Sequence, residues 1–233
     1  MAYELTQNWC PEWLYPLKST YPMTPQGIVV HNTAGTASAA DEIASMIGNT
    51  GSATSFHVAI DEAQAVEAFP FSRCCWHAGD GGQGYANRNL IGIEICRSFD
   101  WSSDKYDKAE ANAVLYIAEV CVQYGWTSDQ LHQHNWYADT ACPHRLKDHW
   151  ESFKQAVDKR IAEIQSGVPE SKPAPGETTA AKDTVRVSLH GYPRDMRGEN
   201  KDGTVYVALR DLLEQMGYTV GWQDGVVAVE YKK

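Results

Sequence analysis

The sequence predicts an α/β domain followed by a smaller second domain. Gly27–His31 (GIVVH) is a short apolar run, rich in β-branched residues and bounded by turn residues, which is typical of a buried strand. Isoleucines at every second position of Leu90–Cys96 predict another strand, with Glu94 on the face opposite the isoleucines. Apolar residues recur at helical spacing between Asp148 and Ile164, which predicts a helix at the end of the first domain.

The segments between these elements add further helices and strands. Ser38 has the character of an N-cap and predicts that a helix begins there. A second helix is expected from a capping box at Asp107 to about Tyr124, because Gly125 is a typical residue to end it. Two more strands are expected at Phe56–Ile60 and Ala65–Phe69.

Residues 166–182 divide the chain. This stretch is rich in proline and small polar residues and has almost no apolar side chain to bury, so it predicts a linker. We therefore expect a first domain over residues 1–165 and a small α+β domain over residues 183–233. The elements expected in the second domain are strands at Val185–Leu189 and Thr204–Val207, a helix at Leu209–Met216, and a hairpin of Tyr218–Trp222 with Val226–Tyr231.

The composition excludes several classes of function. An excess of 30 acidic over 20 basic residues gives a net charge of −10, so the protein would repel a polyphosphate and we expect no nucleic-acid partner. No apolar run approaches the ~20 residues that cross a bilayer, so we expect no membrane insertion. The first residues lack the pattern of a secretory signal. The protein is therefore expected to be made in the cytoplasm and to need release by another route before it acts outside.

Three residues have the chemistry of a metal site. His31 ends the first buried strand, and about a hundred residues later His134 and Cys142 stand eight residues apart. Two imidazoles and a thiolate fill three tetrahedral positions on Zn²⁺ and leave the fourth for water, as in catalytic sites. The spacing alone leaves two alternatives open: His132 in place of His134, or a strand-end histidine and a Cys-Pro turn with structural roles only.

Five blocks of the sequence resemble the zinc-dependent N-acetylmuramoyl-L-alanine amidases of the type-2 amidase and peptidoglycan-recognition-protein family. The blocks are IVVHNTAG (28–35), TSFHVAID (54–61), WHAG (76–79), NLIGIEIC (89–96) and HNWYADTACP (134–143). The resemblance implies a central mixed β-sheet flanked by helices, with one zinc ion in a surface groove. It implies that His31, His134 and Cys142 are the zinc ligands, with His132 beside them. It also implies that the protein cleaves the amide between N-acetylmuramic acid and L-alanine, so bacterial peptidoglycan is the expected partner.

The resemblance also implies roles for residues beside the metal. Glu94 stands where a glutamate of bacterial and phage members acts as general base, whereas a strand pattern alone allows an exposed carboxylate. Thr140 stands where many bacterial members have a lysine that stabilises the oxyanion, and a hydroxyl offers only an ordinary hydrogen bond there. Phe56 replaces a tyrosine of several relatives and is expected to serve packing.

Two further residues are expected near the substrate. His77 lies in a block that forms the groove wall in the family, which implies that it contacts the substrate or the oxyanion. The alternative is that His77 has a structural role only. The glycine-rich stretch 79–85 has no lysine and no following helix signal, so it is not a phosphate loop and is expected to form the rim of the groove. Asn87 would face the substrate at this rim.

The tail and the chain's organisation suggest a biological setting. Residues 202–231 resemble the copper amine oxidase N-terminal-like domain, an accessory module of wall-associated proteins, with no copper implied. A catalytic domain, a spacer and an accessory module resemble a phage or prophage endolysin, which reaches the wall after a holin opens the membrane. A bacterial autolysin is the alternative setting. The alternative functions are a module that binds peptidoglycan without cutting it and a zinc peptidase that cuts within the stem peptide.

Overall fold

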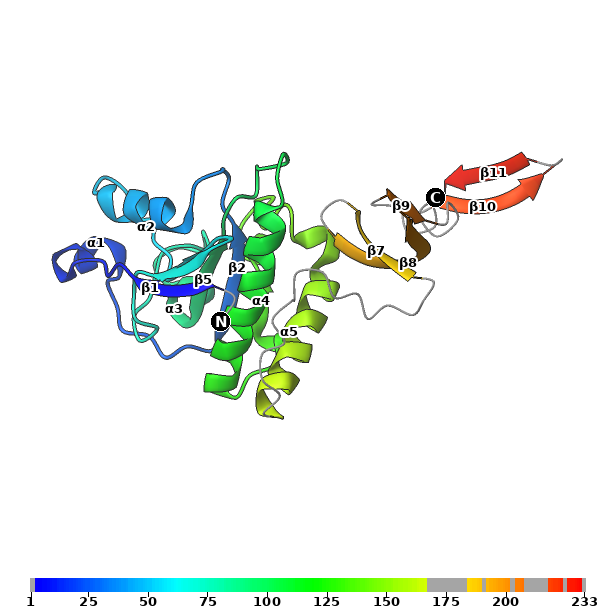
Figure 1. Ribbon diagram of the computed structural model, residues 1–233. Coiled ribbons are helices and arrows are strands. Elements are labelled where there is room, and N and C mark those ends of the chain that lie inside the picture. The colour runs from blue at the N-terminus through cyan, green and yellow to red at the C-terminus, as the bar shows by residue number, and fades with distance from the viewer. Residues whose placement is uncertain are drawn as a thin grey trace. The chain divides into compact units, whose positions relative to one another are not determined.

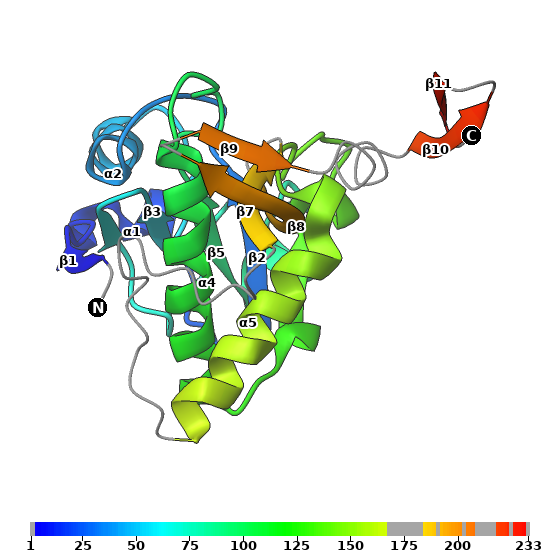
Figure 2. The same cartoon turned by 45° about the vertical axis from the view of Figure 1, so that its right-hand side comes forward.

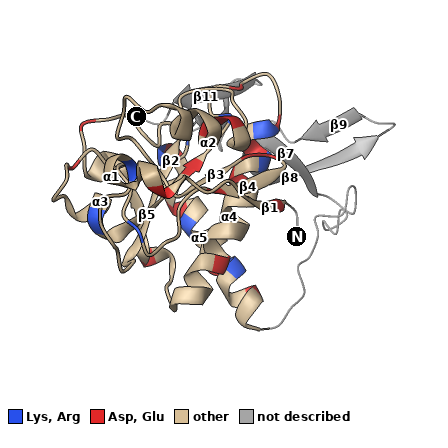
Figure 3. Ribbon diagram, turned by 90° about the vertical axis from the view of Figure 1, so that its left-hand side faces the viewer, with Lys and Arg blue, Asp and Glu red and all other residues tan. Residues whose placement is uncertain are grey.

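The computed structural model describes residues 3–166 and five strands within residues 184–231. The chain divides into two compact units, Met1–Lys172 and Pro173–Lys233. The expected linker, residues 166–182, lies almost wholly outside the described residues, so the domain boundaries stay a prediction. Acidic and basic positions are interspersed along the described ribbon of the first unit (Figure 3). Among the described residues, none of the helices combines the length and the apolarity that a bilayer crossing demands.

The first unit is built on a six-stranded sheet with the strand order β1-β4-β3-β5-β2-β6 (Figure 1). Neighbouring strands pair in parallel, except β3 and β4, which are antiparallel. The predicted mixed sheet is therefore confirmed. Its strands are Glu4–Gln7 (β1), Gly27–Asn32 (β2), Val58–Ile60 (β3), Gln64–Glu67 (β4), Leu90–Ile95 (β5) and Leu131–Gln133 (β6).

Helices flank this sheet, as predicted. Helices α4 (Lys105–Tyr124) and α5 (Trp150–Gln165) lie side by side over the strands (Figures 1 and 2). Apolar side chains of both helices pack with those of the central strands in one buried cluster, which includes Ile93 and Phe153. Helix α2 (Ala39–Gly48) contributes to a second buried cluster. The remaining short helices are Glu12–Leu14 (η1), Tyr15–Lys18 (α1), Tyr85–Asn89 (α3), Ser128–Gln130 (η2), His134–Trp136 (η3) and Lys147–His149 (η4).

The ends of the helices follow local chemistry. Ser38 caps α2 as predicted, because its side chain accepts a hydrogen bond from the backbone N–H of Asp41 and the Asp41 carboxylate bonds back. Gly125 ends α4 in the left-handed conformation at φ +69°, also as predicted. The predicted capping box at Asp107 is wrong: α4 begins at Lys105, and Asp107 lies in its first turn.

In the second unit, β7 (Thr184–Leu189), β8 (Tyr192–Lys201) and β9 (Thr204–Val207) form an antiparallel sheet, and β10 (Tyr218–Gln223) pairs with β11 (Val226–Tyr231) as a hairpin. The sequence did not indicate β8, because its polar and charged residues show no apolar alternation. The helix expected at residues 209–216 lies outside the described residues.

The alternation of strand β2 separates the core of the first unit from the functional site. Ile28 and Val30 belong to the cluster that packs against α4 and α5. His31, one position on from Val30, therefore points to the opposite face of the sheet. His31 pairs with Glu94 in the register between β2 and β5, so both side chains lie on that same face.

Candidate active site

The sheet brings together three residues that are distant in sequence. Strand β2 lies between β5 and β6, so His31 near its end faces the loop that follows β6 and carries His134 and Cys142. The ligand atoms of the three residues all lie within 4.8 Å of one another. His31 Nδ1 is 3.8 Å from Cys142 Sγ, and the rings of His31 and His134 are 4.5 Å apart. This is the arrangement that a single bound ion needs.

Asn32 fixes the loop of Cys142 against β2. Its backbone N–H donates to Cys142 Sγ at 3.3 Å. Its side-chain oxygen accepts hydrogen bonds from the backbone N–H groups of Arg145 and Leu146, at 3.0 and 3.1 Å. Sequence analysis did not single out Asn32. Its position directly after His31, a candidate ligand at the end of a buried strand, was the available signal.

The donor atoms fit a divalent metal. His134 Nδ1 is buried and has no hydrogen-bond partner among the described residues, so its lone pair is free for an ion. Burial, with His77 and His134 nearby, holds the pKa of His31 well below its usual value, so this ring is a neutral donor at pH 7. Burial raises the pKa of the Cys142 thiol to about 12. Since a cation is needed to draw off this proton, metal uptake and thiolate formation are coupled here.

Glu94 lies beside the three ligands. Its Oε1 is 3.9 Å from His31 Nδ1, and its Oε2 is buried without a partner among the described residues. Burial raises the pKa of this carboxyl to about 8, and the nearby Glu42 adds to the shift. At pH 7 this carboxyl is therefore mostly protonated in the metal-free protein, and a cation bound beside it would favour the carboxylate that a general base needs.

Thr140 lies two residues before Cys142 in the same loop. Its hydroxyl oxygen accepts a hydrogen bond from the backbone N–H of Cys142 at 3.2 Å, which leaves the hydroxyl hydrogen available to donate. Phe56 is buried in the second cluster, with residues of α2.

His77 and Asn87 are tied into the protein's own hydrogen bonds. His77 is buried, and its ring contacts Leu90 O at 3.1 Å and His31 Nε2 at 3.0 Å. Burial lowers the pKa of His77 to about 3, with a contribution from nearby His57, so its ring is neutral at pH 7. Asn87 Oδ1 accepts hydrogen bonds from the backbone N–H groups of His77 and Ala78, both at 2.8 Å.

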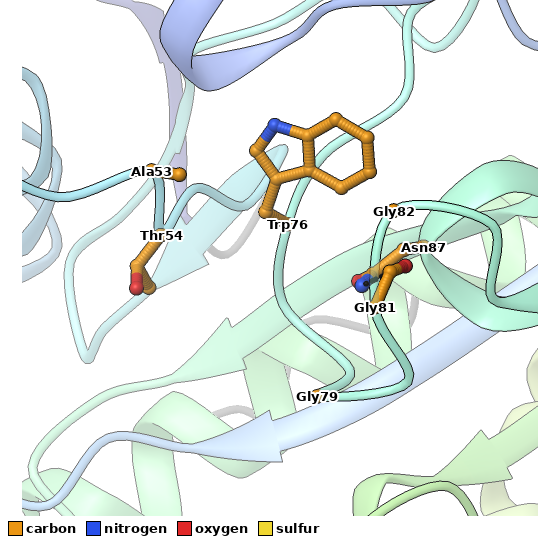
Figure 4. A pocket seen from close by; sticks show the side chains of 7 residues that line it. All are labelled: Ala53, Thr54, Trp76, Gly79, Gly81, Gly82 and Asn87. Atoms are coloured by element: carbon orange, nitrogen blue, oxygen red, sulfur yellow. Dashed lines mark hydrogen bonds between the residues drawn. The ribbon is translucent and has the colours of Figure 1, made fainter.

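A pocket of about 450 Å³ lies between Trp76 and the glycine-rich loop (Figure 4). In Figure 4 the indole of Trp76 stands between the segment of Ala53 and Thr54 and the glycine-rich loop. Gly79 lines this pocket and also lies near His134. A Cβ at this position would lie 2.9 Å from Ala138 Cβ and 3.8 Å from His134 Nε2. The lining residues are Ala53, Thr54, Trp76, Gly79, Gly81, Gly82 and Asn87.

His132, the alternative ligand, is engaged elsewhere. Its Nδ1 lies 2.7 Å from the hydroxyl of Tyr137. His144 follows Cys142 closely, but its ring lies against Phe99, 5.0 Å between centroids. Within the described residues, the group able to hold a metal therefore consists of His31, His134 and Cys142.

Comparison with known proteins agrees with this geometry. The family model described as N-acetylmuramoyl-L-alanine amidase (Amidase_2) matches residues 21–145. The chain is 40% identical to the N-acetylmuramoyl-L-alanine amidase XlyB of Bacillus subtilis over 176 residues, which are 75% of this chain and 54% of XlyB. It is 33% identical to CwlA of the same species, over 83% of this chain and 71% of CwlA. The chain thus spans about half the length of XlyB and 71% of the length of CwlA.

Solved structures extend the comparison. The structure of PlyL is similar with a TM-score of 0.64 and 36% identity, over 67% of this chain and 98% of PlyL. Endolysins of Staphylococcus phages Twort and K match about half of the chain. Since the family model covers more than half of the chain, the protein belongs to the Amidase_2 family of N-acetylmuramoyl-L-alanine amidases.

Proposed function

We propose that this protein is a zinc-dependent N-acetylmuramoyl-L-alanine amidase, which cleaves the amide between N-acetylmuramic acid and L-alanine in bacterial peptidoglycan. The observation that carries the proposal is the convergence of His31, His134 and Cys142 on one point, with Glu94 beside them. Two imidazoles and a thiolate suit Zn²⁺ and leave a coordination position open. Held by these residues, zinc would polarise the scissile carbonyl and lower the pKa of a water molecule.

The protein's own residues then do the rest of the chemistry. Glu94, whose Oε1 lies 3.9 Å from His31 Nδ1, takes the proton of the attacking water as a carboxylate and delivers it to the nitrogen of the departing L-alanine. Thr140 donates its free hydroxyl hydrogen toward the oxyanion of the tetrahedral intermediate. The pocket bordered by Trp76 and Gly79 takes the part of the substrate beside the scissile bond.

Digestion of purified peptidoglycan, with products identified by mass spectrometry, tests this proposal. We expect new amino termini on L-alanine and intact glycan strands, together with one zinc ion per chain by metal analysis. An intact lactyl–alanine link with cleavage inside the stem would instead identify a peptidase. Binding without any product would identify a recognition module, an alternative that the clustering of His31, His134 and Cys142 disfavours.

We also propose a setting and a role for the remaining chain. The protein would be made in the host cytoplasm and act on the wall after release, as an endolysin, and residues 183–233 would help it to bind the wall. Pelleting with purified walls tests the latter role. A chain that ends at residue 165 should pellet less than the full-length protein, and equal pelleting would contradict it.

A further inference from the structure

A chain of hydrogen bonds behind His31 defines which ring nitrogens carry hydrogen. The carbonyl oxygen of Leu90 only accepts, so His77 Nε2, 3.1 Å away, is the donor to it. The neutral ring of His77 then has a lone pair on Nδ1. His31 Nε2 lies 3.0 Å from His77 Nδ1. Since His77 Nδ1 is the acceptor of this hydrogen bond, His31 Nε2 must carry the hydrogen.

The same logic leaves His31 Nδ1 unprotonated. This nitrogen lies on the side of the metal site, 3.8 Å from Cys142 Sγ and 3.9 Å from Glu94 Oε1. The order of donors and acceptors that starts at the carbonyl of Leu90 therefore ends with a lone pair on His31 Nδ1, which faces Cys142 and Glu94.

The surroundings of His77 hold its ring in place. Gly92 of β5 lies so close that a Cβ there would be 2.6 Å from His77 Cγ. The backbone N–H of Gly92 donates to His57 Nδ1 at 2.9 Å, which fixes the strand at this point. Asn87 also holds His77, because its Oδ1 accepts a hydrogen bond from the backbone N–H of His77 at 2.8 Å.

We propose that His77 is a positioning residue, which holds His31 in the tautomer that presents Nδ1 to the metal. This inference rests on the proposed zinc-dependent function, and it gives His77 a role other than the substrate contact that the family resemblance implied. Both ring nitrogens are already engaged and the ring is buried, so little of it is left for a substrate. Partners of this kind fix the orientation of a ligand, and their loss typically weakens metal binding about 10–100-fold.

The variants His77→Asn and His77→Leu form a matched pair for the test. Asn Oδ1 is attached to the same side-chain carbon as His Nδ1, so it retains an acceptor for the hydrogen on His31 Nε2. Leu has nearly the same shape as Asn but no acceptor. Both variants lose the ring and its bond to Leu90 O. The difference between them therefore reports the side-chain amide, whose oxygen is the group able to accept from His31 Nε2.

Two measurements on the full-length protein distinguish the outcomes. The first is zinc affinity by competition with a chromogenic chelator, where we expect His77→Leu to bind about 10–100-fold more weakly than His77→Asn. The second is the ¹⁵N–¹H correlation spectrum of the metal-free protein, in which the wild-type His31 ring should show hydrogen on Nε2 only.

Equal zinc affinities of the two variants, or hydrogen on Nδ1 of His31 in the wild-type spectrum, would overturn the inference. If His77→Leu does not fold, hydrogen on Nδ1 of His31 in the wild-type spectrum would still overturn the inference. Wild-type protein that binds no zinc would instead refute the proposed function. Wild-type protein that binds zinc while the two variants bind it alike would refute the role of His77 only.

Discussion

The substitution Gly92→Ala tests the architecture of the site from its backbone side. A methyl group here would lie 2.6 Å from Cγ, 2.7 Å from Cδ2 and 3.0 Å from Nδ1 of His77. Carbon atoms pack at about 3.5–4.0 Å, so the ring must retreat by about 1 Å. Strand β5 pairs with a strand on each side and cannot move away instead. The retreat would break the 3.0 Å contact between His77 and His31.

We expect Gly92→Ala to lower the free energy of unfolding by about 1–3 kcal/mol, the usual cost of overpacking a dense interior. It should also weaken zinc binding, because His31 loses its partner. Urea denaturation with chelator present measures the first effect, and chelator competition measures the second.

Gly48→Ala is the matched control for this experiment. Gly48 ends α2, and nothing lies within 4 Å of an added methyl group. An alanine there should leave zinc affinity unchanged and leave stability unchanged or raised by up to about 1 kcal/mol. A Gly92→Ala protein with wild-type stability and wild-type zinc affinity would refute the reasoning about His77.

Three further predictions concern single side chains. Glu94→Gln should retain zinc but lose about 10²–10⁴-fold in turnover of peptidoglycan, and near-normal rates would place the general base elsewhere. Cys142→Ser should lose zinc and activity together, measured by metal analysis and digestion, since a hydroxyl is a poor zinc ligand. Burial lowers the pKa of His57 from 6.5 to about 4, so the unfolded chain binds a proton in this range that the folded chain does not. Stability from this group is complete above pH 6.5 and falls by about 3 kcal/mol toward pH 4. Urea denaturation across this range should show a smaller fall for His57→Asn, and an equal fall would contradict it.

Much of the fold was predictable because its central strands carry a strong pattern. The predicted strand Gly27–His31 is observed as Gly27–Asn32, and the predicted strand Leu90–Cys96 as Leu90–Ile95. The edge strands β1 and β6 were not predicted as strands, since four and three residues are too few to show a period. Pairing with a neighbour, which a local pattern does not encode, is what makes them strands.

The residues of the candidate site could also be predicted from the sequence, whereas the hydrogen bonds between them could not. His31, His134 and Cys142 were named from their chemistry and from the family resemblance, and the structure brings their ligand atoms within 4.8 Å. The link from His77 to His31 depends on the direction of a carbonyl in β5 and on the missing side chain of Gly92. Neither feature has a signature in local sequence.

The register of two central strands sets the relative positions of His31 and Glu94. His31 on β2 and Glu94 on β5 are register partners, and Val30 and Ile93 beside them point into the opposite, apolar cluster. A slip of one residue in either strand would turn a charged or polar side chain into that cluster and an apolar one into the site. The hydrophobic core under α4 and α5 therefore fixes the positions of His31 and Glu94 at the same time. Substitutions in this core that disturb the register of the strands should therefore lower catalytic activity, although the substituted residues do not contact the substrate.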